Sequence, residues 1–281
     1  MKKTAYIIQA TLISLWWTAM SLYDSFHEAF QYPGISDIAF NSFLLPDIVV
    51  IAILSIVVAY TKKDNLEYVI LGGFSFATLY CLNASILTKG GILPTIIMTL
   101  GLFYNIFLIS NKRMFRESSS QRTTINMMKT IVQITCVWTI TLFVLPLIIM
   151  KGFGAQIPTM LEANKIGITL FIMFSLVGLY SAVEMVRKGK GTPLPLDQTS
   201  RLVKTGPYAI IRNPMAFAGI GQGLSLTLLL SSIHVLLYTI LGAALWQFVV
   251  RPIEENDMSK RFGVEYEEYK NQVSLWIPKK Q

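Results

Sequence analysis

The sequence predicts an all-α, polytopic membrane protein with about eight transmembrane helices. Of its 281 residues, 53% are hydrophobic and only 14% are charged, whereas charged residues make up about 25% of a soluble domain. The mean hydropathy is +0.53. Long, largely uncharged runs recur along the chain, and about 20 helical residues are enough to cross a hydrocarbon core of about 30 Å.

The predicted spans follow one another with short connections. In order they are residues 5–23, 41–60, 68–88, 92–110, 130–150, 166–186, 215–233 and 235–250. The first span follows two lysines, as a secretory signal would, but it is long and aromatic and has no small-residue cleavage site behind it. It is therefore predicted to remain in the membrane. The last span is short, so its cytoplasmic end is expected to lie at the interface.

Basic residues set the predicted orientation. When the loops are taken alternately, 21 of the 24 Lys and Arg residues fall on one side, and Lys89, Lys151 and Lys165 remain on the other. Because cytoplasmic loops carry an excess of Lys and Arg, both termini are predicted to be cytoplasmic, in the inner membrane if the source is bacterial. Contacts with anionic membrane lipids account for the net charge of +8, and nucleic acid is not an expected partner.

A polar loop divides the chain into two blocks. Residues 1–110 are predicted to form a four-span block of unknown role, residues 111–129 a cytoplasmic basic loop, and residues 130–281 a second block with a cytoplasmic C-terminal segment. The two cysteines lie inside predicted spans, and neither they nor the histidines have the spacing of metal ligands. No metal site is predicted.

Polar residues of the second block gather in two stretches, residues 187–214 and 251–281. The two spans between them are joined at Ser231–His234 with almost no loop, which predicts an antiparallel helical hairpin. The hairpin should return the second stretch to the face of the membrane where the first one ended. The sequence therefore predicts a cytoplasmic pocket where the two stretches converge.

The first stretch is rich in helix breakers. Gly206 and Pro207 predict a turn that presents Tyr208, and Asn213 is expected to cap the next span with Pro214 at its first helical position. Irregular backbone at membrane depth is tolerated where it is buried in protein or lines a cavity. Taken alone, this stretch also fits a plain helix start with basic side chains reaching the interface.

The second stretch begins with a proline that is expected to start a new helix. Pro252 is followed by Glu254 and Glu255, and acidic residues in the first turn favourably oppose the helix dipole. Arg251 stands next to these carboxylates, where it can form a structural ion pair. Neither stretch is decisive by itself.

Together the two stretches resemble a known superfamily. "LVKTGPYAIIRNPMAFAG" and, after the hairpin, "RPIEENDMSKRFGVEYEEYKNQVSLWIP" are similar to the isoprenylcysteine carboxyl methyltransferases and phospholipid methyltransferases. The shared pattern is Gly-Pro-Tyr, Arg-X-Pro before a span, a Glu-Glu pair, Phe-Gly-X-Glu-Tyr-X-X-Tyr, a valine and a closing proline. The resemblance covers roughly residues 165–281, and the first 160 residues show none.

The resemblance implies an integral-membrane enzyme that uses S-adenosylmethionine in a cytoplasm-facing pocket and takes a lipid-like or prenylated substrate from the bilayer. The implied cofactor-binding residues are Lys204, Gly206, Pro207, Tyr208, Arg212, Asn213, Pro214, Met215, Glu254 and Glu255. Arg251 and Glu255 are the implied catalytic residues, nearest the reacting groups. The family often has histidine where this chain has Asn213, and an asparagine cannot titrate.

The acceptor and the class of protein stay open at this point. Arg251 could hold a carboxylate acceptor, whereas an amine acceptor would need a glutamate to take its proton. The alternatives are an NADPH-dependent membrane reductase of the sterol or steroid type, and a transporter or structural membrane protein. Intramembrane charges that mark ion pathways are nearly absent. Glu184 is the candidate, and an ion pair with Arg187 or Lys188 is expected to account for it.

Overall fold

The computed structural model describes residues 2–61, 65–110, 116–158 and 164–277. These residues form helices and connecting loops, and the β contact recorded among them is an isolated bridge between Glu117 and Gln198. The chain divides into two compact units, Met1–Lys112 with Ile149–Gln156 and Arg113–Ile148 with Ile157–Gln281. The predicted all-α class is confirmed.

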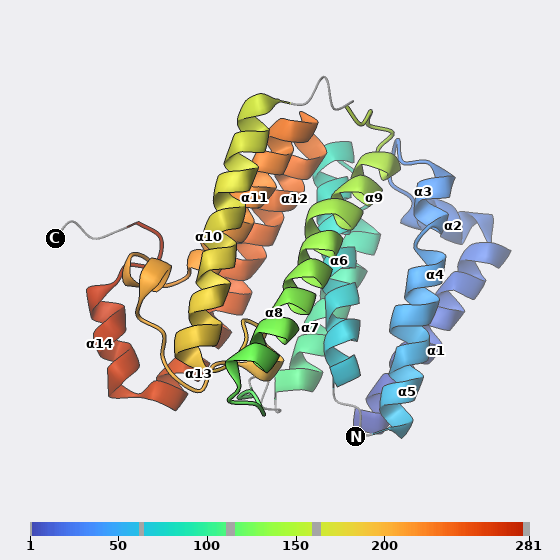
Figure 1. The fold of residues 1–281 in the computed structure, drawn as a ribbon. Helices are drawn as coiled ribbons and strands as arrows, with labels where there is room; N and C mark the ends of the chain where they lie inside the picture. Colours follow the sequence, from blue (N-terminus) through green and yellow to red (C-terminus); the bar gives the residue numbers. More distant parts are fainter. Residues whose placement is uncertain (1, 62–64, 111–115, 159–163, 278–281) are drawn as a thin grey trace. The chain divides into compact units, whose positions relative to one another are not determined.

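The first unit is built mainly from the helices before residue 112 (Figure 1). They are α1 (Lys2–Leu22), α2 (Asp24–Phe30), α3 (Asp37–Asn41), α4 (Leu44–Pro46), the π-helical segment Asp47–Ile53, α5 (Leu54–Tyr60), α6 (Asn65–Thr88) and α7 (Ile92–Ser110). The π-helical segment joins α4 and α5 into one long helix that packs against α1, and α6 and α7 form an antiparallel pair.

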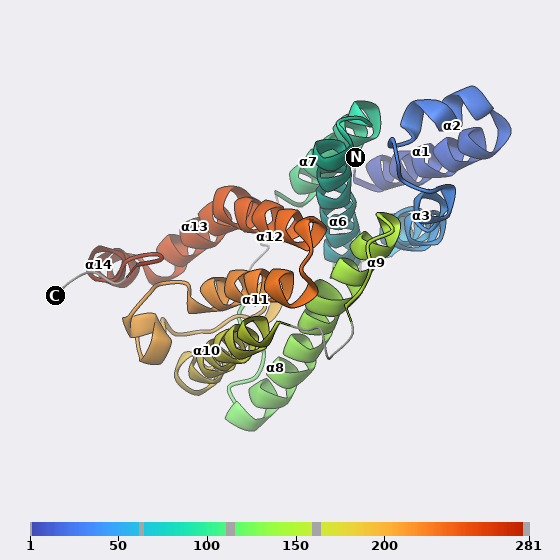
Figure 2. The same cartoon turned by 90° about the horizontal axis from the view of Figure 1, so that it is seen from above.

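The second unit contains the helices that carry the two polar stretches. They are α8 (Thr123–Trp138), the π-helical segment Thr139–Val144, α9 (Leu145–Gly152, whose last four residues belong to the first unit), α10 (Lys165–Gly189), α11 (Pro214–Leu230), α12 (Ile233–Leu245), the π-helical segment Trp246–Val250, α13 (Arg251–Phe262) and α14 (Val264–Gln272). Short 3-10 turns occupy Pro195–Asp197 and Gly206–Ala209. Helices α10, α11 and α12 lie side by side in both ribbon views (Figures 1 and 2).

The lengths of the helices agree with about eight membrane spans. Seven helices of the described residues are long and apolar enough to cross a membrane, namely Lys2–Leu22, Ala39–Tyr60, Asn65–Thr88, Ile92–Ile109, Thr123–Gly152, Lys165–Gly189 and Ile233–Phe262. The eighth predicted span is the shorter apolar helix α11, of 17 residues. This is the architecture of a polytopic integral membrane protein.

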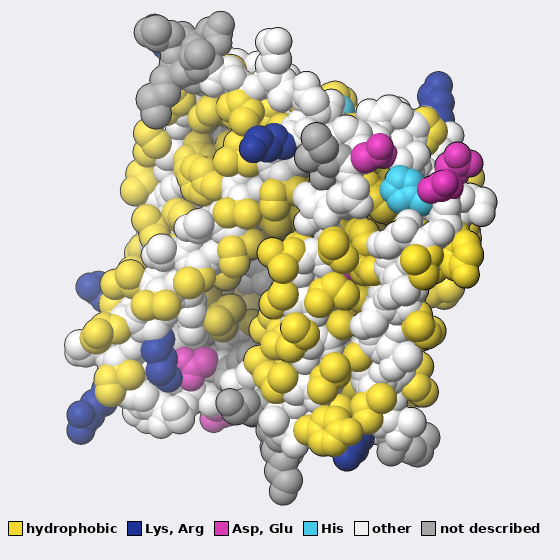
Figure 3. Space-filling view, turned by 90° about the vertical axis from the view of Figure 1, so that its right-hand side faces the viewer, with side chains coloured by type: hydrophobic (Ala, Val, Ile, Leu, Met, Phe, Trp, Pro, Cys, Tyr) yellow, Lys and Arg dark blue, Asp and Glu magenta, His cyan; other side chains and the backbone are white. Residues whose placement is uncertain are grey.

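Large hydrophobic side chains point outward as well as inward. Leu12, Leu100 and Phe107 are examples on helices of the first unit, each about 60% exposed or more. In the face drawn in Figure 3, hydrophobic side chains spread over the middle, while acidic side chains and a histidine gather near the upper end. Such a surface fits a hydrocarbon environment, because a soluble protein rarely exposes large continuous apolar areas.

The predicted hairpin is confirmed, and its turn is very short. Helix α11 ends at Leu230, Ser231 adopts a left-handed conformation with φ of 47°, and Ser232 caps α12 by accepting a hydrogen bond from the Val235 amide. The left-handed residue reverses the chain direction in two residues. The hairpin therefore brings the end of α12 back to the level at which α11 began.

Pro252 stands in the first turn of α13, as predicted, but α13 does not begin after a break in the chain. Helix α12, the π-helical segment Trp246–Val250 and α13 form one continuous helix, Ile233–Phe262. A proline inside an α-helix lacks a donor and clashes with the carbonyl four residues before it. The π-helical turns directly before Pro252 shift the hydrogen-bonding pattern at this point, so the helix continues. Its apolar part is 233–250, and its polar part is α13.

Candidate functional site

The two polar stretches meet beside the α11–α12 hairpin. The backbone N–H of Arg212 donates to the carbonyl of Ser274 over 2.9 Å. The hydroxyl of Tyr269 donates to the carbonyl of Tyr208 over 2.6 Å, in a buried hydrogen bond. Both contacts join the loop before α11 to the segment after α13, so each stretch fixes the position of the other.

A pocket of about 730 Å³ lies between the stretches, and we call it the polar pocket. It is lined by Met185, Pro193, Gln198, Thr199, Leu202, Val203, Tyr208, Arg212, Asn213, Glu254, Glu255, Met258, Arg261, Tyr266 and Tyr269. Pockets for small molecules and cofactors usually combine apolar walls with a few placed polar groups. The polar pocket has this composition.

One wall of the polar pocket is a single face of α13. Glu254, Met258 and Arg261 are spaced four and three residues apart, and Glu255 lies three residues before Met258. Residues three and four apart share a face of an α-helix. Because α13 continues the membrane helix, these side chains are held by a rigid element.

Arg212 is the buried cation of the polar pocket, with a side chain that is 11% exposed. Its Nη1 atom lies 3.1 Å from Glu255 Oε1, and Nη1 of Arg251 lies 3.6 Å from the same oxygen. The Nε atom of Arg212 is buried and has no hydrogen-bond partner within the described residues. Buried donors normally have partners, so this atom is available as a donor.

Glu254 differs from its neighbour Glu255. Its carboxylate forms no ion pair or hydrogen bond with the described residues. Burial and, to a smaller extent, the nearby negative charges of Glu255 and Asp257 together raise the pKa of Glu254 to about 7. The carboxylate is therefore uncompensated in the pocket. A cationic ligand beside it would favour the charged form.

The Gly206 turn rests on α10. Gly206 has φ of 59°, and a Cβ atom at this position would lie 2.9 Å from Cγ of Glu184. The Glu184 carboxylate accepts a hydrogen bond from the Thr205 hydroxyl over 2.6 Å. The expected ion pair of Glu184 with Arg187 or Lys188 is not formed among the described residues. Glu184, which the sequence predicts to lie in a membrane span, thus supports the turn before Tyr208.

Arg261 anchors the opposite wall of the polar pocket. Its Nε atom lies 2.7 Å from Asp257 Oδ2, and its Nη1 atom donates to the carbonyl of Thr199 over 2.8 Å. Because the guanidinium offers several donors in a fixed plane, one side chain connects α13 with the loop at Thr199.

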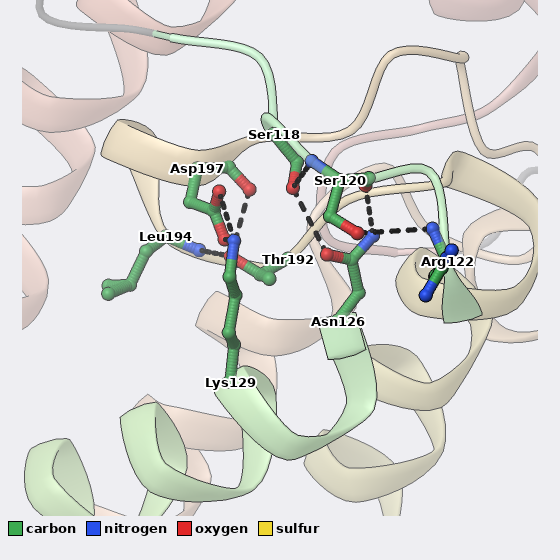
Figure 4. A network of polar contacts seen from close by, with 8 residues as sticks. All are labelled: Ser118, Ser120, Arg122, Asn126, Lys129, Thr192, Leu194 and Asp197. Atoms are coloured by element: carbon green, nitrogen blue, oxygen red, sulfur yellow. Dashed lines mark hydrogen bonds and ion pairs between the residues drawn. The ribbon is translucent and has the colours of Figure 1, made fainter. Parts of the chain in front are cut away.

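The loop at 192–199 is held on its other side by the start of α8. Lys129 forms an ion pair with Asp197 (Figure 4), with Nζ 3.0 Å from Oδ1, and the Thr192 hydroxyl donates to the Asp197 carbonyl over 2.9 Å. Further along, the amide of Ser118 donates to the Gln198 carbonyl over 2.9 Å. Since Gln198 lines the polar pocket, the segment before α8 helps to position the pocket wall.

We expect Asp197→Asn to loosen this loop. The ion pair with Lys129 has side chains that are 34% and 19% exposed, and such a pair contributes about 0.5–1 kcal/mol. Amide hydrogen exchange in 192–199 should therefore become roughly two- to fivefold faster. Lys270→Gln, which removes the exposed pair with Glu267, should leave exchange in this loop unchanged. Equal exchange in Asp197→Asn and the parent protein would contradict the anchoring role of Lys129.

The structure brings five of the residues implied by the resemblance to the polar pocket. These are Tyr208, Arg212, Asn213, Glu254 and Glu255. Six others lie outside its lining: Lys204, Gly206, Pro207, Pro214, Met215 and Arg251. Lys204 forms an exposed ion pair with Glu265 at 2.8 Å, and Arg251 contacts Glu255 while its Nε donates to the Gln247 carbonyl.

Asn213 occupies the N-cap position of α11, but its side chain makes no capping hydrogen bond, contrary to expectation. Its ψ angle of 63° lies outside the extended region typical of capping residues, and the side chain lines the polar pocket instead. Pro214 does stand in the first turn, where a missing N–H costs no hydrogen bond.

Sequence reasoning missed several residues of the polar pocket. Thr199, Met258 and Arg261 were not proposed, and Tyr266 and Tyr269 were noted only as part of the shared pattern. The spacing of 254, 258 and 261 on a helix carried a usable signal for two of them. No signal pointed to Thr199, because its contact with Arg261 spans 62 residues of sequence.

The fold and the pocket define a class: a polytopic helical membrane protein with a polar pocket at the polar ends of its C-terminal helices. Residues 163–265 match the family model of the phospholipid methyltransferases. The predicted resemblance is confirmed for this segment, which is less than half of the chain and contains most of the polar pocket. Searches among curated proteins and among solved structures found no match.

Proposed function

We propose that this protein transfers a methyl group from S-adenosylmethionine to a lipophilic acceptor from the bilayer, with the polar pocket as the cofactor site. One observation carries the proposal. Within the segment that matches the phospholipid methyltransferases, Tyr208, Arg212 and Asn213 converge with Glu254 and Glu255 around one pocket, although the two groups are about 40 residues apart in sequence.

The residues of the polar pocket fit the proposed cofactor. When bound, S-adenosylmethionine supplies a methyl group on a positively charged sulfur, and the transfer leaves a neutral thioether. Glu254 offers an uncompensated carboxylate to that positive charge, and the nearby rings of Tyr266 and Tyr269 offer faces that stabilise cations. The buried Nε donor of Arg212 suits a carboxylate or hydroxyl oxygen of the ligand.

An amine is the acceptor that these side chains favour. Arg251, which could have held a carboxylate, is engaged with Glu255 and with the Gln247 carbonyl and lies outside the pocket lining. Methylation of an ammonium requires that a base first remove its proton, and a carboxyl with a pKa of about 7 is suited to that role. Glu254 thus meets two demands in turn: its negative charge attracts the cofactor, and it then takes the proton of the ammonium and becomes neutral before the amine attacks the methyl group.

The orientation belongs to the same proposal. The excess of Lys and Arg on one side favours both termini and the polar pocket in the cytoplasm. S-adenosylmethionine is a soluble cytoplasmic metabolite, whereas the acceptor is lipophilic. A pocket at the end of the membrane helices is reached by both.

The test uses the purified full-length protein in an uncharged detergent. Isothermal titration with S-adenosylmethionine should show one binding site, and S-adenosylmethionine labelled in its methyl group should label a long-chain primary amine. A carboxylic acid of the same chain length should stay unlabelled. Failure to bind S-adenosylmethionine would overturn the proposal, and label on the acid alone would overturn the choice of an amine.

Two variants and one other titration sharpen the result. Glu254→Gln should lower labelling of the amine at least about tenfold, because the base is lost. Glu268→Gln, which alters an exposed carboxylate of α14 outside the pocket, should label like the parent protein. NADPH should not bind; its binding, with reduction of an unsaturated lipid, would favour the membrane reductase instead.

A further inference from the structure

The first unit contains a second pocket, of about 520 Å³, which we call the aromatic pocket. It is lined by Trp16, Trp17, Tyr32, Ile35, Phe40, Phe43, Asp47, Ala77, Tyr80, Cys81, Pro94 and Met98. Six of these residues are aromatic, and one is a carboxylate. All belong to the N-terminal block, to which neither the sequence nor the family match assigns a role.

Asp47 is the acidic residue of the aromatic pocket. It is 9% exposed and begins the π-helical segment within the membrane span Ala39–Tyr60. Its Oδ2 atom accepts a hydrogen bond from Nε1 of Trp17 over 3.0 Å, and no cation among the described residues pairs with it. An ionisable side chain inside a membrane span is costly and usually serves a function, and π-helical turns often mark functional sites.

Two further polar atoms in this pocket have no partner. Nε1 of Trp16 and the hydroxyl of Tyr80 are buried and form no hydrogen bond with the described part of the chain. Both side chains line the aromatic pocket, and Tyr80 is 5% exposed. A core built for stability alone would pair such groups with hydrogen-bond partners, because an unpaired buried polar atom is destabilising. The pocket is thus prepared for a polar ligand group.

An apolar groove adjoins the aromatic pocket. It has about 820 Å³ of space and is lined by Leu12, Ile13, Leu15, Trp16, Ala19, Phe26, Ile97 and Met98. Trp16 and Met98 belong to both linings, so the two spaces are neighbours. Leu12 and Leu15 are 60% and 59% exposed, which opens the groove to the hydrocarbon side of the helix.

We propose that the aromatic pocket binds the head group of a cationic amphiphile, whose hydrocarbon chain lies in the adjoining groove. A carboxylate surrounded by aromatic faces is the arrangement that recognises an organic ammonium, since the ring faces and the acid both attract positive charge. A neutral head group would leave the buried Asp47 charge without an opposite charge beside it, and an anionic head group would be repelled. This site does not depend on the methyl transfer proposed above.

The experiment compares two probes of equal chain length on the full-length protein in an uncharged detergent. Tetradecyltrimethylammonium is expected to bind saturably with a change in tryptophan fluorescence, and tetradecanol at least about tenfold more weakly. Asp47→Asn should weaken binding of the ammonium at least about tenfold and leave tetradecanol unchanged, because a contact between two charged partners is stronger than one with a neutral amide. Asp37→Asn, an exposed acid outside both linings, should bind both probes like the parent protein.

A second variant keeps the proposal testable if Asp47→Asn does not fold. Trp16→Phe retains an aromatic ring and the Asp47–Trp17 hydrogen bond, but it weakens the cation–π attraction, so the ammonium should bind roughly two- to threefold more weakly. Equal affinity of the parent protein for the two probes would overturn the proposal. So would unchanged ammonium binding in a folded Asp47→Asn variant.

Discussion

Replacing Arg212 with methionine is expected to weaken binding of S-adenosylmethionine at least tenfold and to lower the melting temperature of the purified protein. The substitution removes the 3.1 Å ion pair with Glu255 and the buried Nε donor. Losing one partner of a fully buried pair costs about 3–5 kcal/mol. The cost here should be smaller, because the pair is only partly buried and Glu255 keeps a second cation. Among the described residues, the cation that Glu255 would keep is Arg251, at 3.6 Å. Isothermal titration and a thermal unfolding scan measure the two effects.

A matched control shows whether losing an ion pair elsewhere in the protein also weakens cofactor binding. Glu265→Gln removes the pair with Lys204, whose side chains are 46% and 51% exposed, so the change should be within about 1 kcal/mol and leave cofactor binding intact. Arg212→Lys keeps the charge but not the planar fork, and an intermediate affinity is expected. An Arg212→Met variant that binds the cofactor as tightly as the parent protein would remove Arg212 from the proposed site.

Glu254 should make the stability of the protein depend on pH. Its folded-state pKa of about 7 lies above the ordinary value of 4.5. Between these two values the folded protein keeps the proton and the unfolded chain loses it, so the stabilising contribution present at low pH is lost as the pH rises through about 7. Glu254→Gln should therefore raise the melting temperature at pH 8 and change it little at pH 4.5.

The same carboxylate should make cofactor affinity depend on pH. A positive charge on the ligand lowers the pKa of Glu254, so S-adenosylmethionine should bind more tightly as the pH rises from 6 to 8. The neutral thioether S-adenosylhomocysteine carries the same amino and carboxyl groups and serves as the matched ligand. The ratio of the two affinities is expected to rise severalfold over this range in the parent protein.

In Glu254→Gln the affinity ratio should stay constant between pH 6 and 8, because the side chain no longer titrates. If the ratio rises equally in both proteins, a group other than Glu254 responds to the positive charge of the ligand. A flat ratio in the parent protein would show that Glu254 lies away from the positively charged sulfur.

The membrane spans and the convergence of the two polar stretches could be predicted from the sequence because they depend on local signals. Hydrophobic length identifies a span, and the two-residue connection at Ser231 and Ser232 leaves room only for an antiparallel hairpin. The hairpin in turn requires that the stretches on either side meet. The resemblance then identified five of the side chains that line the polar pocket.

The other features depend on contacts that no local pattern reveals. The sequence predicts a first-turn proline at Pro252, but it does not predict that α13 continues α12. The π-helical turns that join the two helices leave no signature in the residue types. Glu184 was paired with its sequence neighbours, but its partner, Thr205, comes from a loop that folds back on α10. The aromatic pocket was missed for the same reason, since Trp17 and Asp47 lie 30 residues apart on different helices.

The uninterrupted helix 233–262 fixes the distance between the hydrocarbon core of the bilayer and Glu254. Its apolar part, 233–250, is about 27 Å long at 1.5 Å per residue, close to the thickness of a hydrocarbon core. Glu254 stands four residues further on, about 6 Å beyond the apolar end. The carboxylate that we propose as the base is thus set at the depth of the lipid head groups by bilayer thickness. Thicker or thinner membranes should shift that depth and with it the access of an acceptor to the pocket.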